Sequence, residues 1–380
     1  MEPQASAEQT VKGSTTEQQA PGLGMPSGAL DLAYQDTLNL FTEFKVNVTK
    51  PSSESIRYSE EGAGFYLLRV APGPGVSTDR VLSRTDDLKI KLGLTESQSI
   101  RTYLDRGCVA FEVPKQPGET YPIVAEDLWS KWTPDSSRLC VPLGEDISRE
   151  VVSIDFSSAN SAHLLIAGMT GAGKSVALDT ILRGLRHLVP EPRLRMSLVD
   201  PKGTELVDFE GDPCLDGEIG IGAEDAILAL EKAVAEMERR YQVLREAKKR
   251  SIAEYNQSAA GEEVLPWHLV VLDEYADLVS DPDDKKIIEQ HLARLAQKAR
   301  AAGVHVIVAT QNPKADIINT TIRSNLGAQL ALRVQDGSAS QVVLGEPGAQ
   351  HLAGLGDAIF KTPAGTKRFQ VAALRSRLSS

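Results

Sequence analysis

Residues 163–175, HLLIAGMTGAGKS, decide the fold of this 380-residue chain. The stretch opens with an apolar run of strand length. From Gly168 to Ser175 it fits the phosphate-loop pattern G-x-x-x-x-G-K-[ST], which requires a strand before it and a helix after it. The glycines let successive backbone N–H groups form an anion nest, to which the helix N-terminus adds partial positive charge. The stretch therefore predicts a phosphate-binding site on an α/β sheet.

The residues of this loop have separate expected roles. Lys174 can reach the β- and γ-phosphates of a nucleotide, and the Ser175 hydroxyl can ligate Mg²⁺. ATP and Mg²⁺ are the expected cofactors. The expected nucleotide-binding residues are Gly168, Thr170, Gly171, Ala172, Gly173, Lys174, Ser175 and Val176.

Further apolar runs follow at intervals filled by helical patterns. Runs without alternation suit strands that are buried on both faces, and the intervening helices suit crossover connections in a parallel sheet. The longest expected helix covers about residues 223–250, where apolar residues recur three and four apart. The runs are residues 163–168, 194–200, 268–273, 304–310 and 329–334.

Polar residues end two of these expected strands. Asp273 and Glu274 follow one run, at the edge where the phosphate loop lies, because the carboxyl ends of parallel strands share an edge. Asp273 is then placed to hold Mg²⁺ through water, and Glu274 to activate the attacking water. Gln311 ends the next strand and can contact the γ-phosphate, or it can simply bond local backbone.

Two basic features stay ambiguous in the sequence. Lys202, in the segment Val199-Asp-Pro-Lys202, can serve as a phosphate-side charge or as a salt-bridge partner. Residues 239–250, RRYQVLREAKKR, carry six cations against one carboxylate and can contact DNA phosphates. A solvated helix end that complements the helix dipole is the competing interpretation.

The pattern before the loop differs from the pattern after it. Residues 1–29 are rich in Gln, Ser, Thr, Gly and Pro, and we expect a disordered tail there. Residues 30–145 alternate helical patterns, one of them around residues 79–92, with short strands such as 65–72 and 108–114, which predicts a small α+β domain. Residues 146–380 make up the expected P-loop domain.

Composition narrows the class of protein. With 41% hydrophobic and 24% charged residues, the chain is neither wholly disordered nor collagenous nor a membrane protein. Three scattered cysteines indicate a reducing compartment, and no apolar run has the ~18–20 residues of a membrane span, so we expect a cytoplasmic protein. The net charge of −11 disfavours a surface that coats nucleic acid, although a local basic channel remains compatible with it.

Several motifs in fixed order resemble one family. The chain is similar to the motor domain of FtsK/SpoIIIE-type DNA translocases, within the FtsK/HerA superfamily of RecA-like ATPases. The upstream residues 69–94 look like the small domain that precedes the motor, and the likeness covers roughly residues 35–375. The motifs are GMTGAGKS, VDPKGTEL, VVLDEYADL, RLAQKARAAGVHVIVATQNP and GAQHLAGLGDAIF.

The resemblance implies a hexameric ring around double-stranded DNA, with each nucleotide at a subunit boundary. Family members usually carry arginines at the positions of Gln329 and Gln341. If either of those arginines normally serves as an arginine finger, stabilising the transition state at the nucleotide of the neighbouring subunit, this chain must use another arginine. The candidates are Arg300, Arg323 and Arg333. Arg300 is the catalytic residue we expect to act in trans.

Modules that accompany the motor in the family have no counterpart here. Neither the membrane region nor the winged-helix module that reads oriented DNA is recognisable, so we expect a soluble form. Its directional loading then either comes from an unidentified partner or does not exist. The expected function is an ATP-driven double-stranded DNA translocase of a plasmid, phage or mobile element. The alternatives are a nucleotide-gated DNA-binding protein without processive translocation and a conjugation-type DNA pump.

Overall fold

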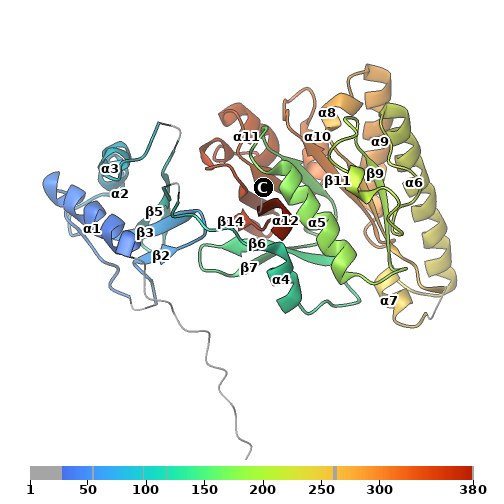
Figure 1. Cartoon of the computed structure of the whole chain (residues 1–380), viewed down its shortest axis with the longest axis horizontal. Helices are drawn as coiled ribbons and strands as arrows, with labels where there is room; N and C mark the ends of the chain where they lie inside the picture. The colour runs from blue at the N-terminus through green and yellow to red at the C-terminus, as the bar shows by residue number, and fades with distance from the viewer. Residues whose placement is uncertain (1–27, 54, 97, 117, 260–262, 379–380) are drawn as a thin grey trace, which may run out of the picture.

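The computed structural model describes residues 28–378 except 54, 97, 117 and 260–262. The expected disordered tail therefore lies almost wholly outside the described residues. Two sheets, joined by the segment around residues 115–125, lie side by side along the long axis of the molecule (Figure 1).

The first sheet is small and antiparallel, with the order β1-β3-β5-β4 and β2 paired to β3. Its strands at 65–72 and 108–114 have the bounds that the alternation predicts. Helix α1 covers one face and buries Leu30, Tyr34 and Phe41 against it. The elements are α1 (Gly28–Glu43), β1 (Val48–Thr49), β2 (Ser59–Glu61), β3 (Phe65–Pro72), α2 (Thr78–Leu82), α3 (Thr85–Lys91), β4 (Arg101–Asp105) and β5 (Cys108–Pro114).

The second sheet has nine strands in the order β7-β6-β14-β13-β12-β8-β11-β10-β9. The run from β12 to β9 is parallel, as the uninterrupted apolar runs predict, and the remaining pairs are antiparallel. Its strands are β6 (Cys140–Asp146), β7 (Val151–Asp155), β8 (Leu164–Ala167), β9 (Leu194–Val199), β10 (Trp267–Leu272), β11 (Val304–Thr310), β12 (Ala328–Leu332), β13 (Asp357–Thr362) and β14 (Gly365–Val371).

Helices cover both faces of this sheet (Figure 1). On strand β8, Leu164 and Ile166 pack with α5 on one face, whereas Leu165 and Ala167 pack with α6 and α9 on the other. Both layers are needed because every residue of the central strands is buried. The helices are α4 (Ala125–Lys131), α5 (Lys174–Leu188), α6 (Ala223–Glu246), α7 (Ile252–Asn256), α8 (Tyr275–Leu278), α9 (Pro282–Lys298), α10 (Thr320–Asn325), α11 (Gly337–Leu344) and α12 (Arg375–Leu378), with 3-10 turns at Val207–Phe209 and Ala349–His351.

Three sequence expectations differ in detail from the structure. The helical pattern around 79–92 forms two helices, because the Thr85 hydroxyl donates to the Leu82 carbonyl and competes with the helical ladder. Helix α6 ends at Glu246 because Lys248 adopts a left-handed φ of 54°. The boundary expected at 145/146 falls in the β6–β7 hairpin of the large sheet, and the division into domains stays a prediction.

Candidate active site

The phosphate-loop sequence joins β8 to α5, the context that its motif requires. Gly171 and Gly173 have φ angles of 79° and 104°, a region that favours glycine. A Cβ on Gly173 would lie 2.8 Å from the backbone nitrogen of Gly356, and one on Gly168 would lie 2.9 Å from the Cβ of Leu332. Gly173 is thus required both by backbone conformation and by close packing, whereas Gly171 is required by conformation and Gly168 by packing.

The two carboxylates after β10 lie beside this loop. Asp273 is buried and forms an ion pair with Lys174, whose side chain is buried as well. Burial raises the pKa of Asp273, and the neighbouring Lys174 ammonium opposes that rise. The geometry places one cation and one anion of the predicted site in direct contact.

Glu274 occupies an unusual backbone position. It has a left-handed φ of 43°, which is costly for a residue with a Cβ, and it is 4% exposed. Its Oε1 accepts hydrogen bonds from Thr310 Oγ1 at 3.0 Å and from the Gln311 backbone N–H at 3.1 Å. The ends of β10 and β11 are thereby joined through the candidate base.

Gln311 connects the same edge to the phosphate loop. Its Oε1 accepts a hydrogen bond from Thr170 Oγ1 at 2.9 Å, while its backbone N–H faces Glu274. The hydrogen-bond partner of Gln311 Oε1 is therefore a loop residue distant in sequence and not local backbone. Lys174, Asp273, Glu274 and Gln311 gather at the carboxyl edge of the parallel strands.

Lys202 also reaches this edge. Its Nζ lies 3.4 Å from Glu274 Oε2. The preceding Asp200 is buried, and its carboxylate accepts backbone N–H groups from Lys202, Glu205 and Leu206, which fixes the turn after β9. The salt-bridge interpretation of Lys202 thus has a partner in this structure.

The three candidate trans arginines occupy different surroundings. Arg300 is exposed and precedes β11, at the sheet edge opposite the phosphate loop. The Arg323 guanidinium donates to the Gln341 carbonyl at 2.7 Å, and Gln329 Nε2 donates to the Arg323 carbonyl. Arg333 adjoins its own phosphate loop, because its carbonyl accepts the Met169 N–H at 2.8 Å.

The basic run 239–250 is partly neutralised within the chain. Arg240 is fully buried, and its guanidinium contacts Glu236 and the carbonyl of Ala302. Arg239 binds the same glutamate. Burial alone would raise the pKa of Glu236, but the bonds from these two arginines outweigh it and lower the pKa to about 2. Arg240 is therefore unsuited to contacting DNA, contrary to the simplest interpretation of the run.

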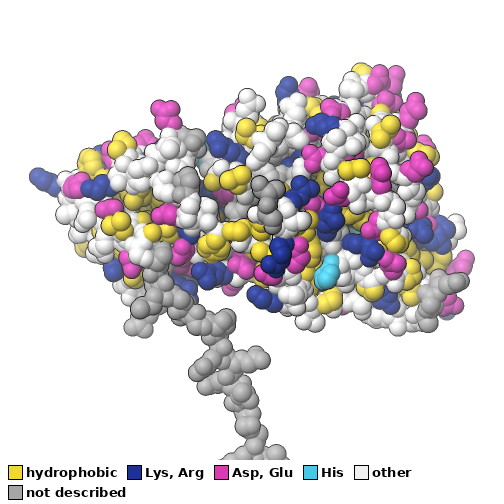
Figure 2. Space-filling model, viewed as in Figure 1, with side chains coloured by type: hydrophobic (Ala, Val, Ile, Leu, Met, Phe, Trp, Pro, Cys, Tyr) yellow, Lys and Arg dark blue, Asp and Glu magenta, His cyan; other side chains and the backbone are white. Residues whose placement is uncertain are grey.

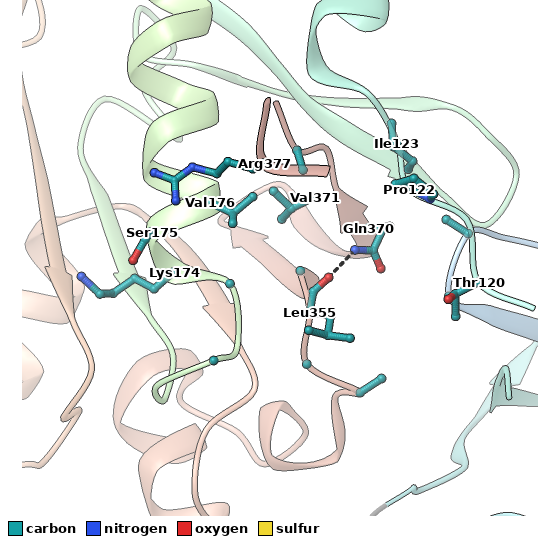
Figure 3. Close-up of a pocket in the computed structure, with 18 of the residues that line it drawn as sticks. Thr120, Pro122, Ile123, Lys174, Ser175, Val176, Leu355, Gln370, Val371 and Arg377 are labelled. Carbon is teal, nitrogen blue, oxygen red and sulfur yellow. Dashed lines mark hydrogen bonds between the residues drawn. The ribbon is translucent and has the colours of Figure 1, made fainter. Parts of the chain in front are cut away.

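A cavity of about 730 Å³ opens beside the phosphate loop (Figure 3). The phosphate loop lines one part of it, and segments from both ends of the chain line the rest. Sequence reasoning missed these remote segments, for which the paired glycines of Gly354-Leu355-Gly356 were the available signal. They include Lys115, Thr120, Tyr121, Pro122, Ile123, Leu355, Gln370, Val371 and Arg377.

Comparisons with known proteins identify the family of this chain. The FtsK/SpoIIIE family model matches residues 124–315. The DNA translocase FtsK of Lactiplantibacillus plantarum is 35% identical over 309 residues, which are 79% of this chain and 38% of that protein. The DNA translocase SftA of Bacillus subtilis is 34% identical over 304 residues, 79% of this chain and 31% of that protein. The chain thus spans only about a third of the length of these relatives.

Solved structures show the same fold. The conjugation coupling protein TcpA of pCW3, in a monomer form with ATPgS, has a TM-score of 0.62 at 24% identity and covers 92% of this chain and 97% of that one. The type VII secretion ATPase EccC of Thermomonospora curvata has a TM-score of 0.59 over 67% of this chain and 32% of that one. No helix among the described residues is long and apolar enough to cross a membrane. The RecA-like fold, the site geometry and the family match agree, and the chain belongs to the FtsK/SpoIIIE family.

Proposed function

We propose that this protein is an ATPase that drives the translocation of double-stranded DNA. The carrying observation is the network at one sheet edge, in which buried Lys174 pairs with buried Asp273. Beside this pair, Glu274 accepts the Gln311 N–H, and the Gln311 side chain bonds Thr170 of the phosphate loop. This network supports the roles that we propose: Lys174 as the phosphate-binding cation, Asp273 as the metal-side carboxylate and Glu274 as the general base. Membership of a family of DNA translocases supplies the substrate class.

The donor set fits Mg²⁺. The Ser175 hydroxyl in the first turn of α5 and the Asp273 carboxylate are hard oxygen ligands, which this ion prefers. When bound, the ion neutralises charge on the β- and γ-phosphates. Lys174 can exchange its bond to Asp273 for the phosphates, since their negative charge attracts the same ammonium. The backbone N–H groups of the loop bind the remaining phosphate oxygens.

Glu274 is proposed to orient the attacking water and accept its proton. Its hydrogen bonds to Thr310 and the Gln311 N–H fix the carboxylate, and its left-handed backbone turns it back toward the strand ends. Gln311 touches both this base and Thr170 of the loop, so it is placed to respond to loss of the γ-phosphate. These roles remain proposals.

The proposed assembly is a hexameric ring with DNA in its bore. The net charge of −11 is compatible with a DNA substrate if basic residues concentrate at the bore. Arg300 is the proposed trans finger, because Arg323 is engaged with the Gln341 carbonyl and Arg333 adjoins its own loop. A role for a plasmid, phage or mobile element and a separate loading partner are part of the same proposal.

The direct test is ATP turnover with and without linear duplex DNA. The proposal expects duplex DNA to stimulate turnover and expects Glu274→Gln to abolish it. Asp277→Asn, an exposed carboxylate change one helical turn away, serves as the matched control and should retain stimulation. Equal turnover with and without DNA, or full activity of Glu274→Gln, would contradict the proposal.

A conjugation-type DNA pump is the second candidate. One observation favours it: the coupling protein TcpA shares the fold over 92% of this chain. Competition between duplex and single-stranded DNA in the turnover assay separates the two functions. A pump for single strands should be stimulated more by single-stranded DNA, and the proposed translocase by the duplex.

A further inference from the structure

Leu355 combines an exposed apolar side chain with a backbone conformation that is costly for a residue with a Cβ. It is a large apolar side chain with 87% of its surface exposed, and its backbone φ is 51°, in the left-handed region. Its neighbours Gly354 and Gly356 have φ angles of 86° and 89°, so three consecutive residues share this conformation. Only the central residue carries a side chain that makes the conformation costly.

The surrounding hydrogen bonds hold Leu355 in this position. The Gly356 N–H donates to Ala172 of the phosphate loop at 2.9 Å, and the Val371 N–H donates to the Gly356 carbonyl at 2.8 Å. Gln370 Nε2 donates to the Leu355 carbonyl itself at 2.7 Å. The loop is therefore fixed to the phosphate loop on one side and to strand β14 on the other.

The Leu355 side chain faces the cavity beside the phosphate loop (Figure 3). Lys174 and Ser175 lie at one end of this space, and Thr120, Pro122 and Ile123 lie across from Leu355 at the other. Val371 lines the space between these two ends. The cavity is thus cationic and rich in backbone N–H groups at one end, and largely apolar at the other.

A volume of about 730 Å³ lies in the range of pockets that enclose small ligands. With the phosphates held at the loop, the remaining part of a nucleotide is the ribose and a flat base with apolar faces. Such a base is stabilised by contact with apolar side chains that are already fixed in place. The apolar end of the cavity offers that contact.

We propose that Leu355, with Val371, forms the platform on which the nucleobase lies, and that residues 120–123 close the opposite side. The inference rests on the proposed function only in placing the phosphates at the phosphate loop. In this proposal the base also lies between the large sheet and the segment that connects the small sheet to it. Leu355 is accordingly a determinant of affinity for the nucleoside part and not for the phosphates.

The test compares ATP with inorganic tripolyphosphate, which lacks the nucleoside, by titration calorimetry on the full chain. Leu355→Asn is suitable because the residue is exposed and Asn tolerates a positive φ. ATP affinity should fall about tenfold or more, in keeping with the loss of a buried leucine contact, while tripolyphosphate affinity stays unchanged. Leu104→Asn, at a 63% exposed position on β4, should change neither.

Three outcomes would overturn the proposal: unchanged ATP affinity, an equal fall for both ligands, or a change in oligomeric mass that accounts for the effect and makes Leu355 a subunit contact. Lys174→Ala should lower the affinity for both ligands and serves as the control for a defect in phosphate binding. Hydrogen exchange gives a second readout. ATP should protect the backbone amides of Thr120, Tyr121 and Ile123, and tripolyphosphate should not; equal protection by the two ligands contradicts the proposal.

These results are separable from failure of the translocase function. Absence of DNA-stimulated turnover would contradict the proposed function, while nucleotide binding that depends on the base and on Leu355 could still be observed. Conversely, intact DNA stimulation with base-independent binding would remove only the present inference.

Discussion

At the scale of single residues, the sequence predicts those functional residues that belong to a short motif or follow an apolar run. Lys174 and Ser175 belong to one short motif, whereas Asp273, Glu274 and Gln311 are found because they end apolar runs. Leu355 and residues 120–123 could not be placed in this way, since their proximity to the loop depends on how distant segments pack. The left-handed φ of Glu274 was equally hidden, because no glycine or asparagine marks it.

Replacing Glu274 or Lys174 should separate catalysis from binding. Glu274→Gln keeps the shape of the side chain and removes the base, so turnover should fall by about 10²–10⁴-fold with ATP binding retained. Lys174→Ala removes the main cation at the phosphates and should weaken binding itself. Calorimetry alongside a phosphate-release assay checks this, and equal binding losses in the two variants would contradict the assigned roles.

At the scale of elements, the strands that are buried on both faces were predictable, and the antiparallel half of the large sheet was not. Strands β13 and β14 pair as a hairpin next to β12, and β6 joins them from the other side of the phosphate loop in sequence. Strand β14 also contacts the small sheet through Arg368 and Glu112, 256 residues apart in sequence, and no local periodicity reports such a contact.

Arg368 should be essential for stability. Its side chain is buried and binds Asp357 on β13 at 2.6 Å and Glu112 on β5 of the small sheet at 2.5 Å. Arg368→Met leaves the buried Asp357 carboxylate without its cation and leaves Glu112 paired, among the described residues, with only Arg101, at 3.3 Å. It should lower the free energy of unfolding by about 3–5 kcal/mol in urea titrations. Combining it with Asp357→Asn and Glu112→Gln should restore part of the loss.

A matched control for this variant is Arg106→Met, at an arginine whose side chain is 69% exposed. It should change the free energy of unfolding by less than about 1 kcal/mol. An Arg368→Met protein as stable as the wild type would show that the buried pair does not join the sheets.

Three buried histidines at the amino edge of the large sheet should make stability fall with acid. Burial lowers the pKa of His163 and His268 to about 4 and that of His305 to about 3, so the folded state resists protonation. The unfolded chain takes up these protons near pH 6.5, so stability is complete above that pH and is lost as the pH falls toward 4.

Urea unfolding at pH 7 and pH 5 measures this effect. His268→Gln can keep a polar partner for Ser197, whose hydroxyl lies 2.9 Å from His268 Nε2, and removes one titrating group. Arg240 and Arg195 also act on His268 and favour its neutral form. The difference in unfolding free energy between the two pH values should be smaller in His268→Gln, and an unchanged difference would contradict the assignment.

At the scale of the whole molecule, composition was the least informative guide. A net charge of −11 disfavours a surface that coats DNA. A DNA substrate is compatible with this charge only through the proposed ring, in which basic residues concentrate at the bore. The basic run 239–250 illustrates the limit, because Arg240 is buried inside the fold. The proposed ring also requires an arginine that acts at the nucleotide of the neighbouring subunit.

Arg300→Ala should lower DNA-stimulated turnover by about 10³-fold while leaving nucleotide binding intact, because a finger in trans acts mainly on the transition state. Arg294→Ala is the matched control: Arg294 is an exposed arginine on α9 that pairs with Glu238. Turnover assays on purified oligomers check both. If Arg300→Ala matches the control, another arginine serves in trans or no finger exists.

Displacement of a third strand from triplex-bearing duplex DNA is the most direct test of translocation. The wild-type protein should strip the third strand only with hydrolysable ATP, and Glu274→Gln should leave it in place. A protein that binds the duplex and hydrolyses ATP but never displaces the third strand would be a nucleotide-gated DNA-binding protein, and that result would contradict translocation.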